Sequence, residues 1–329
     1  MSELREKSVL VTGASGFIGG QLAEQLSRKE GARVLGTGRR FSNEKALREA
    51  GVEIIRADLR DAATLSKLCT DKHVVFHMAA WGGRQGGVKE AYAVNVDATR
   101  ALAEAAAAAG VKRFVLASTV AAYGLPTVDE IDESVPIDVN QGDLYGRTKA
   151  LGEQAALEVA RRTGLPLTIV RPGMVYGPGS AVWTIGMLRM VQKGAPVLLG
   201  DGSGYAFPVY IDDVLDLLRR AATRPEAVGQ AFNVCGPSIP WEQFFGYYAR
   251  MSGRRLRRLP MFLAQLLART NEFLALGLPL TPERVQYVSR RLQFSSARAE
   301  RQLDFRFGVP LDEGMQRSEA WLRKEGYLR

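Results

Sequence analysis

Residues 12–20 read TGASGFIGG, a glycine-rich stretch between two segments of different periodicity. Before it, SVLV (residues 8–11) is typical of a buried strand, and after it apolar residues recur at helical spacing. Glycines on such a strand-to-helix turn allow close approach to a diphosphate, and the helix N-terminus offers it free N–H groups. We therefore expect a dinucleotide site contacted by Gly13, Ser15, Gly16, Phe17, Ile18 and Gly19.

The spacing of these glycines is GxxGxxG, which differs from the commonest dinucleotide fingerprint, GxGxxG. A glycine-rich turn with a purely structural role has a similar pattern. The position between a strand and a helix favours the dinucleotide interpretation.

The choice between NAD and NADP depends on the end of the second predicted strand, residues 32–37 (ARVLGT). NAD sites usually place an acid about twenty residues after the glycines, where it binds the ribose hydroxyls. Here Gly38 is followed by Arg39 and Arg40, and an arginine suits a 2′-phosphate. We therefore expect NADP(H), with NAD(H) as the alternative. Two solvated arginines in a loop would also explain the pattern.

Composition and length are those of an ordinary globular protein. The 329 residues are 46% hydrophobic and 24% charged, enough for one large domain or two unequal ones. Cys69 and Cys235 each lie in an apolar run, which predicts buried, reduced thiols in a cytoplasmic protein. With only His73 and His77 available, we expect no histidine-based metal centre.

Charge and hydropathy give no indication of nucleic-acid binding or of a membrane span. The net charge is +9, but basic residues are scattered apart from Arg254–Arg258, and no nucleic-acid motif accompanies them. The N-terminus has no apolar signal segment, and the apolar stretch 262–280 is interrupted by charged residues. We interpret the charge as attraction for anionic cofactors or surfaces.

Strand-like and helix-like segments alternate through the first half of the chain. Further strands are expected at 52–57, 72–79 and 113–117, with an alanine-rich helix at 99–109 closed by Gly110. This alternation predicts an α/β fold with a doubly wound parallel sheet, whose ligands bind at the carboxyl ends of the strands. Helical patterns dominate the C-terminal part, at 241–251, 261–276, 282–291, 296–303 and 312–325.

Seven motifs together resemble the extended short-chain dehydrogenase/reductase superfamily over essentially the whole chain. They are TGASGFIGG, ADLRD, FHMAA, ASTVAAYG, YGRTK, RPGMVYGPG and FNVCGPS. This superfamily includes NAD(P)-dependent epimerases, dehydratases and 3β-hydroxysteroid-type dehydrogenases, and the C-terminal part is most similar to the last branch. The resemblance implies a Rossmann domain over residues 1–175, to which 205–235 returns. Residues 176–204 and 236–329 would form a smaller, mostly helical substrate-binding cap.

Tyr145 and Lys149 are four residues apart, so on a helix they share one face. A surface pair is the usual meaning of this spacing, but the resemblance implies the catalytic YxxxK motif. Tyr145 would then be the general acid/base, and Lys149 would lower its pKa and hold the nicotinamide ribose. The resemblance places the catalytic hydroxyl at Thr119, with Ser118 as second choice. It also implies a supporting role for Asn95, which could equally be a helix cap.

Other motif positions are expected to line the cofactor and substrate sites. For the cofactor these are Asp58, Leu59, Ala79, Ala80, Pro172, Gly173 and Val175, the last three resembling the segment that passes the nicotinamide. For the substrate they are Trp81, Thr119, Met174, Tyr205 and Phe207.

Two departures from the superfamily patterns narrow the reaction. Val120 and Ala121 follow Thr119, where sugar-nucleotide dehydratases have Asp-Glu. Ala206 occupies the position at which UDP-sugar epimerases have a diphosphate-binding arginine. We therefore favour reversible hydride transfer between nicotinamide and a carbonyl or alcohol of an apolar, steroid- or lipid-like substrate. An epimerase acting on a sugar or sugar nucleotide, and a non-catalytic NADP-sensing regulator, are the alternatives.

The cap and the alanine-rich helix lead to two expectations about surfaces. In helix 261–276, Phe262, Leu263, Leu266, Leu267, Phe273 and Leu274 form one apolar face, which we expect mostly to pack in the core and partly to cover the substrate. Arg254–Arg258 could touch an anionic membrane, although a solvated basic turn is the simpler explanation. A homodimer through the alanine-rich helix and the Tyr145 helix is expected from Ala103, Ala106, Ala107 and Ala160, unless these face the parent sheet.

Overall fold

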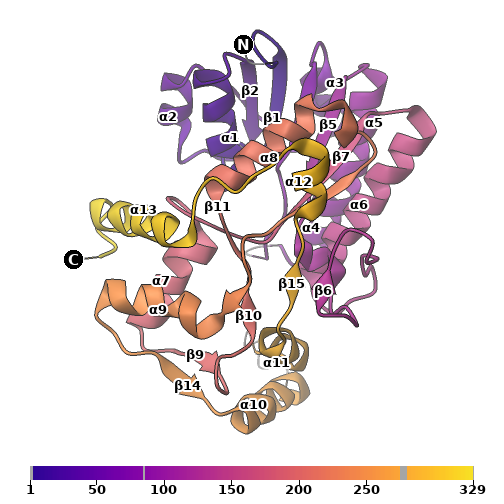
Figure 1. Cartoon of the computed structure of the whole chain (residues 1–329). Coiled ribbons are helices and arrows are strands. Elements are labelled where there is room, and N and C mark those ends of the chain that lie inside the picture. Colours follow the sequence, from indigo (N-terminus) through magenta and orange to yellow (C-terminus); the bar gives the residue numbers. More distant parts are fainter. Residues whose placement is uncertain (1–2, 84–85, 275–279, 329) are drawn as a thin grey trace.

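A seven-stranded parallel sheet forms the centre of the molecule (Figure 1). The computed structural model describes residues 3–83, 86–274 and 280–328. The strand order β12-β7-β5-β4-β1-β2-β3 is that of a doubly wound sheet, so the predicted Rossmann fold is confirmed. The strands are β1 (Ser8–Thr12), β2 (Arg33–Gly38), β3 (Glu53–Arg56), β4 (Val74–His77), β5 (Arg113–Ala117), β7 (Leu167–Pro172) and β12 (Ala231–Val234).

Both faces of this sheet are buried except at the edge strand β3, because alternate residues of the other strands belong to different apolar cores. In β1, Val9 and Val11 pack with helices α1 (Phe17–Arg28) and α8 (Ile211–Thr223). Leu10 packs on the opposite face with α3 (Ala62–Cys69), α5 (Ala98–Ala108) and α6 (Leu144–Thr163). Continuous apolar strands covered by helices on both sides are typical of parallel sheets. A short helix, α2 (Glu44–Glu49), adds Leu47 to the first core.

A smaller, mostly helical region lies at the end of the molecule opposite the central sheet (Figure 1). Its elements are α7 (Met187–Gln192), β9 (Pro196–Leu199), β10 (Tyr205–Ala206), β13 (Ile239–Pro240), α9 (Trp241–Ser252), β14 (Arg257–Leu259), α10 (Met261–Leu274) and α11 (Pro282–Ser289). β12 belongs to the central sheet, whereas β10 pairs with β13. The domain boundaries given above stay a prediction.

Short strand pairs join the two regions. β8 (Met174–Tyr176) continues directly from β7 and pairs in parallel with β11 (Pro208–Tyr210), which leads into α8. β15 (Gln293–Phe294) pairs with β6 (Glu130–Ile131) and is followed by α12 (Ala297–Leu303) and α13 (Leu311–Lys324). The chain therefore crosses between sheet and cap several times.

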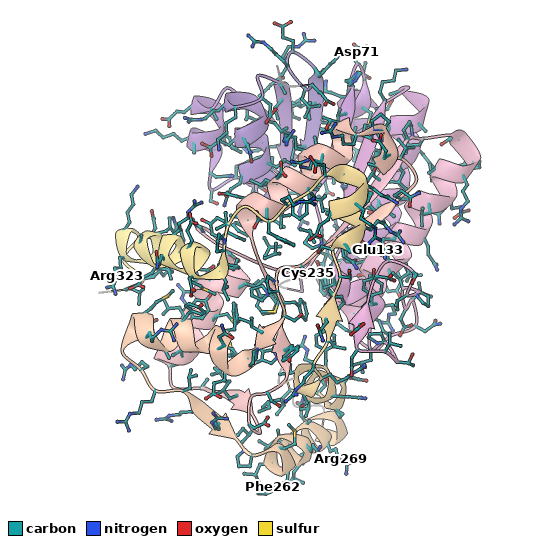
Figure 2. All side chains as sticks on the ribbon, viewed as in Figure 1. Asp71, Glu133, Cys235, Phe262, Arg269 and Arg323 are labelled. Carbon is teal, nitrogen blue, oxygen red and sulfur yellow. The ribbon has the colours of Figure 1, made fainter. Side chains whose placement is uncertain are left out.

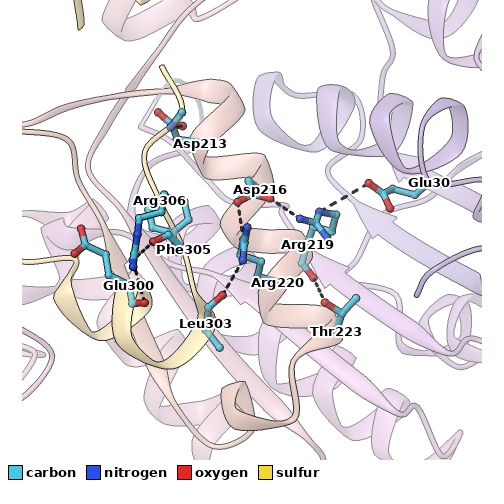
Figure 3. Close-up of polar contacts among 11 residues, drawn as sticks. Glu30, Asp213, Asp216, Arg219, Arg220, Thr223, Glu300, Leu303, Phe305 and Arg306 are labelled. Atoms are coloured by element: carbon cyan, nitrogen blue, oxygen red, sulfur yellow. Dashed lines mark hydrogen bonds and ion pairs between the residues drawn. The ribbon is translucent and has the colours of Figure 1, made fainter. Parts of the chain in front are cut away.

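Helix α8 is attached to α1 and α12 by neighbouring arginines (Figure 3). Arg219 pairs with Glu30, just beyond α1, at 3.8 Å. Arg220 donates to the Leu303 carbonyl at the end of α12 over 2.9 Å. Asp216 accepts from both arginines, at 2.6 and 2.7 Å, and holds them in place.

No helix within the described ranges is long and apolar enough to cross a membrane. Cys69 and Cys235 are both buried and free, as the sequence predicts.

Candidate active site

The glycine loop between β1 and α1 lies against the end of β4. Gly13 has φ +68°, and a Cβ there would lie 2.7 Å from the Ala79 amide nitrogen. A Cβ on Gly19 would lie 2.4 Å from the Gly13 carbonyl oxygen. Each position therefore requires glycine, one for its backbone conformation and one for the close contact between α1 and the turn.

The first turn of α1 is suited to bind a diphosphate. Gly16 is its N-cap and provides no side-chain hydrogen bond, and no acid occupies the first turn. The first N–H groups of the helix are thus without a side-chain cap, and the positive end of its dipole meets no carboxylate there. This observation fits the dinucleotide implied by the sequence.

An ion-pair cluster lies at the carboxyl ends of β2 and β3. Arg39 Nη1 is 2.7 Å from Glu90 of α4 (Gly87–Tyr92), and Arg60 bridges Glu90 and Asp58. The hydrogen bond from Arg60 lowers the pKa of Asp58 to about 2. Arg39 is therefore not simply solvated, because a carboxylate holds it beside the glycine loop.

At Gly38, the last residue of β2, the Ser15 side chain occupies the space that a larger residue such as an acid would need. A Cβ on Gly38 would lie 2.6 Å from Ser15 Oγ. Ser15 of the glycine loop thus approaches the place where NAD sites present their acid. Among the remaining predicted contacts, Leu59 and Ala79 are half-buried and Ala80 is exposed.

Tyr145 lies in the first turn of α6, and its side chain is close enough to the Thr119 hydroxyl for that group to lower its pKa. Thr119 is the N-cap of a short 3-10 turn after β5, η2 (Val120–Tyr123), and accepts from the Ala121 amide over 3.2 Å. The two elements bring together the two residues that the sequence selected 26 positions apart. Their catalytic roles stay a prediction.

Burial raises the pKa of Tyr145 to about 12, outweighing the lowering effect of the Thr119 hydroxyl, and Asp143 raises it further. Lys149 is not among the causes of this shift in the chain alone, and its expected lowering of the pKa together with a bound oxidised nicotinamide stays a prediction. Lys149 is 4% exposed and its Nζ donates to the Ala117 carbonyl over 2.7 Å. Burial lowers its own pKa to about 8, although the Glu153 carboxylate opposes this shift.

Beneath Lys149 lies a buried charged pair that sequence reasoning missed. The Glu153 carboxylate on α6 accepts from Arg171 on β7, with the closest contact at 2.6 Å and side-chain exposures of 0% and 8%. Arg171 also donates to the Tyr123 hydroxyl over 2.8 Å. The available signal was the position of Glu153, one helical turn beyond Lys149 on the same face.

Ser118 belongs to this buried pair, because its hydroxyl donates to Glu153. It is 7% exposed and points toward the carboxylate, whereas Thr119 reaches Tyr145. The geometry therefore favours Thr119 over Ser118 as the hydroxyl next to the substrate.

Asn95 is a buried residue that connects two segments of the candidate site. It is 2% exposed and lies in a π-helical turn, η1 (Ala93–Asp97), where its amide exchanges hydrogen bonds with the backbone of Trp81 and donates to Thr148 Oγ1 on α6 over 2.9 Å. A Cβ on Gly152 of α6 would lie 2.2 Å from the Asn95 carbonyl oxygen. Asn95 thus links the Trp81 loop to the tyrosine helix, and it is not a helix cap.

The residues predicted to line the nicotinamide and the substrate differ in accessibility. Pro172 and Val175 are buried, and a Cβ on Gly173 would meet the Phe207 carbonyl oxygen at 2.8 Å. Met174 and Phe207 are 1% and 4% exposed, so their side chains pack in the core. Trp81, Thr119 and Tyr205 are the half-buried members of the predicted substrate set.

Helix α11 covers the start of the tyrosine helix. Arg284 lies 3.8 Å from the Asp143 carboxylate, which caps α6. Tyr287 contacts the Phe207 ring, with centroids 6.3 Å apart, and the Asp143 charge is among the causes that raise its pKa. Tyr287 is therefore a cap residue close to Asp143 at the start of the tyrosine helix, which the sequence did not reveal.

The apolar face of α10 is turned to solvent. Phe262 is 68% exposed and Leu266 is 59% exposed, with Leu263 and Leu267 at 36% and 45%. The expectation of core packing is wrong for these four residues, because α10 uses Ala264 and Ala268 for burial. The side chains of Phe273 and Leu274 lie outside the described part.

The alanines predicted to form a dimer face the chain's own core. Ala103 and Ala106 are fully buried between α5 and the sheet, and Ala107 and Ala160 pack against the same cluster. The alternative, that these small residues face the parent sheet, accounts for them.

A cavity of about 250 Å³ lies elsewhere, between β11 and the segment before α13. Its lining includes Tyr176, Tyr210, Asp213, Phe307 and Leu311, but neither Tyr145 nor Lys149. It is therefore separate from the candidate active site. The described residues contain no group of three or more side chains suited to hold a metal ion.

The buried histidine on β4 is held in place by hydrogen bonds to two threonines. His77 is hydrogen-bonded to Thr12 and Thr99 at 2.8 and 3.0 Å. Burial lowers its pKa to about 3, so it is neutral at physiological pH.

Comparison with known proteins agrees with this geometry. The model of the NAD dependent epimerase/dehydratase family matches residues 9–235. The chain is 29% identical to 3beta-hydroxysteroid-dehydrogenase/decarboxylase isoform 1 of Arabidopsis thaliana, over 95% of this chain and 79% of the relative. It is 28% identical to the decarboxylating sterol-4-alpha-carboxylate 3-dehydrogenase of Schizosaccharomyces pombe, over 97% and 98%. It is 34% identical to the UDP-glucose 4-epimerase of Mycolicibacterium smegmatis, over 68% and 76%.

Solved structures share the fold. The structure of gox2253 superposes with a TM-score of 0.84 at 26% identity, covering 99% of this chain and 100% of the other. UDP-glucuronic acid 4-epimerase from Bacillus cereus in complex with NAD gives a TM-score of 0.78 at 22% identity, covering 97% and 98%. The chain therefore belongs to the NAD-dependent epimerase/dehydratase family, and it is an enzyme.

Proposed function

We propose that this enzyme transfers hydride between a nicotinamide cofactor and the carbonyl or alcohol of an apolar, steroid- or lipid-like substrate. The observation that supports it most is the placement of the Tyr145 phenol next to the Thr119 hydroxyl, which lowers its pKa, with the buried Lys149 one helical turn further. A tyrosine placed beside a second hydroxyl can hold a substrate oxygen and move a proton to or from it.

The proton chemistry of the site suits carbonyl reduction. A pKa of about 12 keeps the Tyr145 phenol protonated at neutral pH, so it can donate to the oxygen that becomes an alcohol. Thr119 orients that oxygen, and Lys149, anchored on the Ala117 carbonyl, holds the nicotinamide ribose. The bound nicotinamide supplies the hydride in this direction and accepts it in the reverse one.

Two observations support an apolar substrate. Ala206 is fully buried where sugar-nucleotide enzymes need a cation, and a diphosphate without a cation is poorly held. The similarity to sterol and hydroxysteroid dehydrogenases extends over nearly the whole chain. The 34% identity to a UDP-glucose 4-epimerase keeps sugar-nucleotide epimerisation as the second candidate.

We also propose NADP(H) as the preferred cofactor, with NAD(H) as the alternative. Arg39 and Arg40 follow β2, and Gly38 presents no acid. A 2′-phosphate would take the place of Glu90 as the partner of Arg39. The non-catalytic regulator receives no support, because Tyr145 and Lys149 are both present.

Calorimetric titration in the presence of NADP tests the substrate class. Steroid-sized or long-chain ketones should bind at micromolar concentration and be reduced by NADPH, and UDP-sugars should not bind. Micromolar binding of UDP-glucose, with no binding of the apolar ketones, would contradict the proposal and favour the epimerase.

A further inference from the structure

The exposed face of α10 is an apolar cluster at the outer edge of the cap. Phe262, Leu263, Leu266 and Leu267 lie on one side of the helix, all at least 36% exposed. Figure 2 shows Phe262 at the edge of the molecule farthest from the central sheet. Other exposed large apolar side chains of the described residues are dispersed over separate elements. Such a cluster is typical of an interaction surface. We call these four residues the α10 patch.

The orientation of α10 is fixed by its opposite face. Ala264 and Ala268 are fully buried and pack with Val285 of α11. Asn271 donates to the Leu280 carbonyl over 2.8 Å. Because small side chains form the buried face, the large ones of the α10 patch point outward.

Exposed arginines lie on α10 and in the segment that leads into it. Arg254, Arg255 and Arg257 precede the helix, and Arg269 lies on the helix, as does Phe262 (Figure 2). Within the described residues, no carboxylate lies at ion-pair distance from any of these four, whereas Arg258 pairs with Glu242. An exposed apolar helix face together with unneutralised arginines in the same part of the cap is complementary to a surface that is apolar inside and anionic outside.

We propose that the α10 patch and the arginines at 254, 255, 257 and 269 dock this enzyme on an anionic lipid bilayer, with α10 in the plane of the headgroups. A helix of 14 residues is about 21 Å long, too short to span about 30 Å of hydrocarbon but suited to lie at its surface. A second copy is a poorer occupant, because a twofold contact between two patches would bring like-charged arginines together. The docking is independent of the substrate proposed above.

Vesicle flotation tests the docking. The full-length protein should bind vesicles of three parts phosphatidylcholine to one part phosphatidylglycerol, and bind phosphatidylcholine vesicles at least about tenfold more weakly. The double variant F262S/L266S should lose binding to the anionic vesicles. V128S/V228S is the matched control, because these valines are 46% and 42% exposed on other elements, and it should bind as the parent does.

Charge-reversal variants measure how much the arginines contribute to vesicle binding. R254E/R255E should weaken binding at least about fivefold for each arginine changed. The control K112E/R161E has the same change in net charge on the exposed surface of the sheet region and should have a much smaller effect. Unchanged NADPH binding and melting temperature in every variant would show that the fold is intact.

Spin labelling distinguishes a bilayer from a protein partner. Both native cysteines are buried, so a nitroxide on the F262C variant is selective. On anionic vesicles the label should become accessible to oxygen and protected from a water-soluble nickel complex, whereas a label on the V228C variant should not change. Equal binding to neutral vesicles, absence of vesicle binding, or a dimer that F262S/L266S dissociates without any vesicle binding would each overturn the proposal.

Discussion

Tyr145 is the residue on which the proposed chemistry depends. Tyr145→Phe removes only the hydroxyl and should reduce kcat at least about a hundredfold, because the phenol is the group proposed to move the substrate proton. NADPH affinity measured by fluorescence should stay within about twofold, since Tyr145 is only one of many predicted cofactor contacts. Tyr327→Phe, far from Tyr145 in the C-terminal segment, is the control and should keep full activity. Near-normal turnover in Tyr145→Phe would place the chemistry elsewhere.

We predict that two further residues, Arg39 and Glu90, determine the choice between NADP and NAD. Arg39→Ala should weaken NADPH binding by about 1.5 to 3 kcal/mol, the usual value for a charge-assisted hydrogen bond, and hardly affect NADH. Glu90→Gln should strengthen NADPH binding, because it removes the carboxylate that competes with the 2′-phosphate. Titrations of both cofactors measure the selectivity ratio. An unchanged ratio in Arg39→Ala would remove the NADP assignment.

Helix α6 and strand β7 are held together by the buried Glu153–Arg171 pair. Glu153→Gln leaves the guanidinium without its counter-charge and should lower the free energy of unfolding by about 3 to 5 kcal/mol. It should also move the pKa of Lys149 further below about 8, because Glu153 is the charge that raises it. Urea unfolding measures the first effect. Glu158→Gln on the exposed side of the same helix is the control and should change stability little; equal effects of the two changes would contradict the role of burial.

Helix α8 should make stability depend on pH through Asp213. Burial raises the pKa of this carboxyl to about 6, with Asp212 and Asp216 adding to the shift, although the Gly308 amide donates to it over 2.7 Å. The folded protein therefore binds more protons than the unfolded chain between about pH 4 and 6, and stability from this group is lost as pH rises through 6.

Asp213→Asn keeps an oxygen for the Gly308 amide and removes the titration. Relative to the parent, the variant should be more stable at pH 7.5 than at pH 4.5 by about 1 to 3 kcal/mol. Urea unfolding at the two pH values checks this difference. A difference of the opposite sign would show that the carboxyl is stabilised as an anion.

For the whole molecule, we still expect a homodimer through the outer surfaces of α5 and α6. The buried alanines do not contribute, so the contact would involve exposed residues such as Arg100 and Glu158, which pair at 2.7 Å across the two helices. Light scattering at micromolar concentration should give twice the chain mass of 36.0 kDa. A mass of 36.0 kDa would remove the dimer.

Local signals in the sequence were enough to predict the sheet and the order of the motifs. The strand expected at 72–79 appears as β4 at 74–77, and the helix expected at 99–109 appears as α5 at 98–108. Contacts distant in sequence were not predictable in this way. Neither residue type nor spacing showed that Arg171 meets Glu153, or that Tyr287 of the cap lies close to Asp143 at the start of α6.

Periodicity also could not tell which side of α10 is buried. Its pattern contains two faces, one with alanines and one with large apolar residues, and the rule that large apolar residues are buried selects the wrong one. The raised pKa of Tyr145 in the chain alone was not predictable for a related reason. Burial sets it, and burial depends on the assembled fold.

The adjacent arginines of α8 connect the end of α1 with the C-terminal segment of the chain. Arg219 contacts Glu30 just beyond α1 and Arg220 contacts the Leu303 carbonyl at the end of α12, so α8 cannot shift without disturbing both contacts. We therefore expect α1, α8 and α12 to open as one unit. Their amide hydrogens should exchange at similar rates, and a cofactor bound at the N-terminus of α1 should slow exchange in α12 as well.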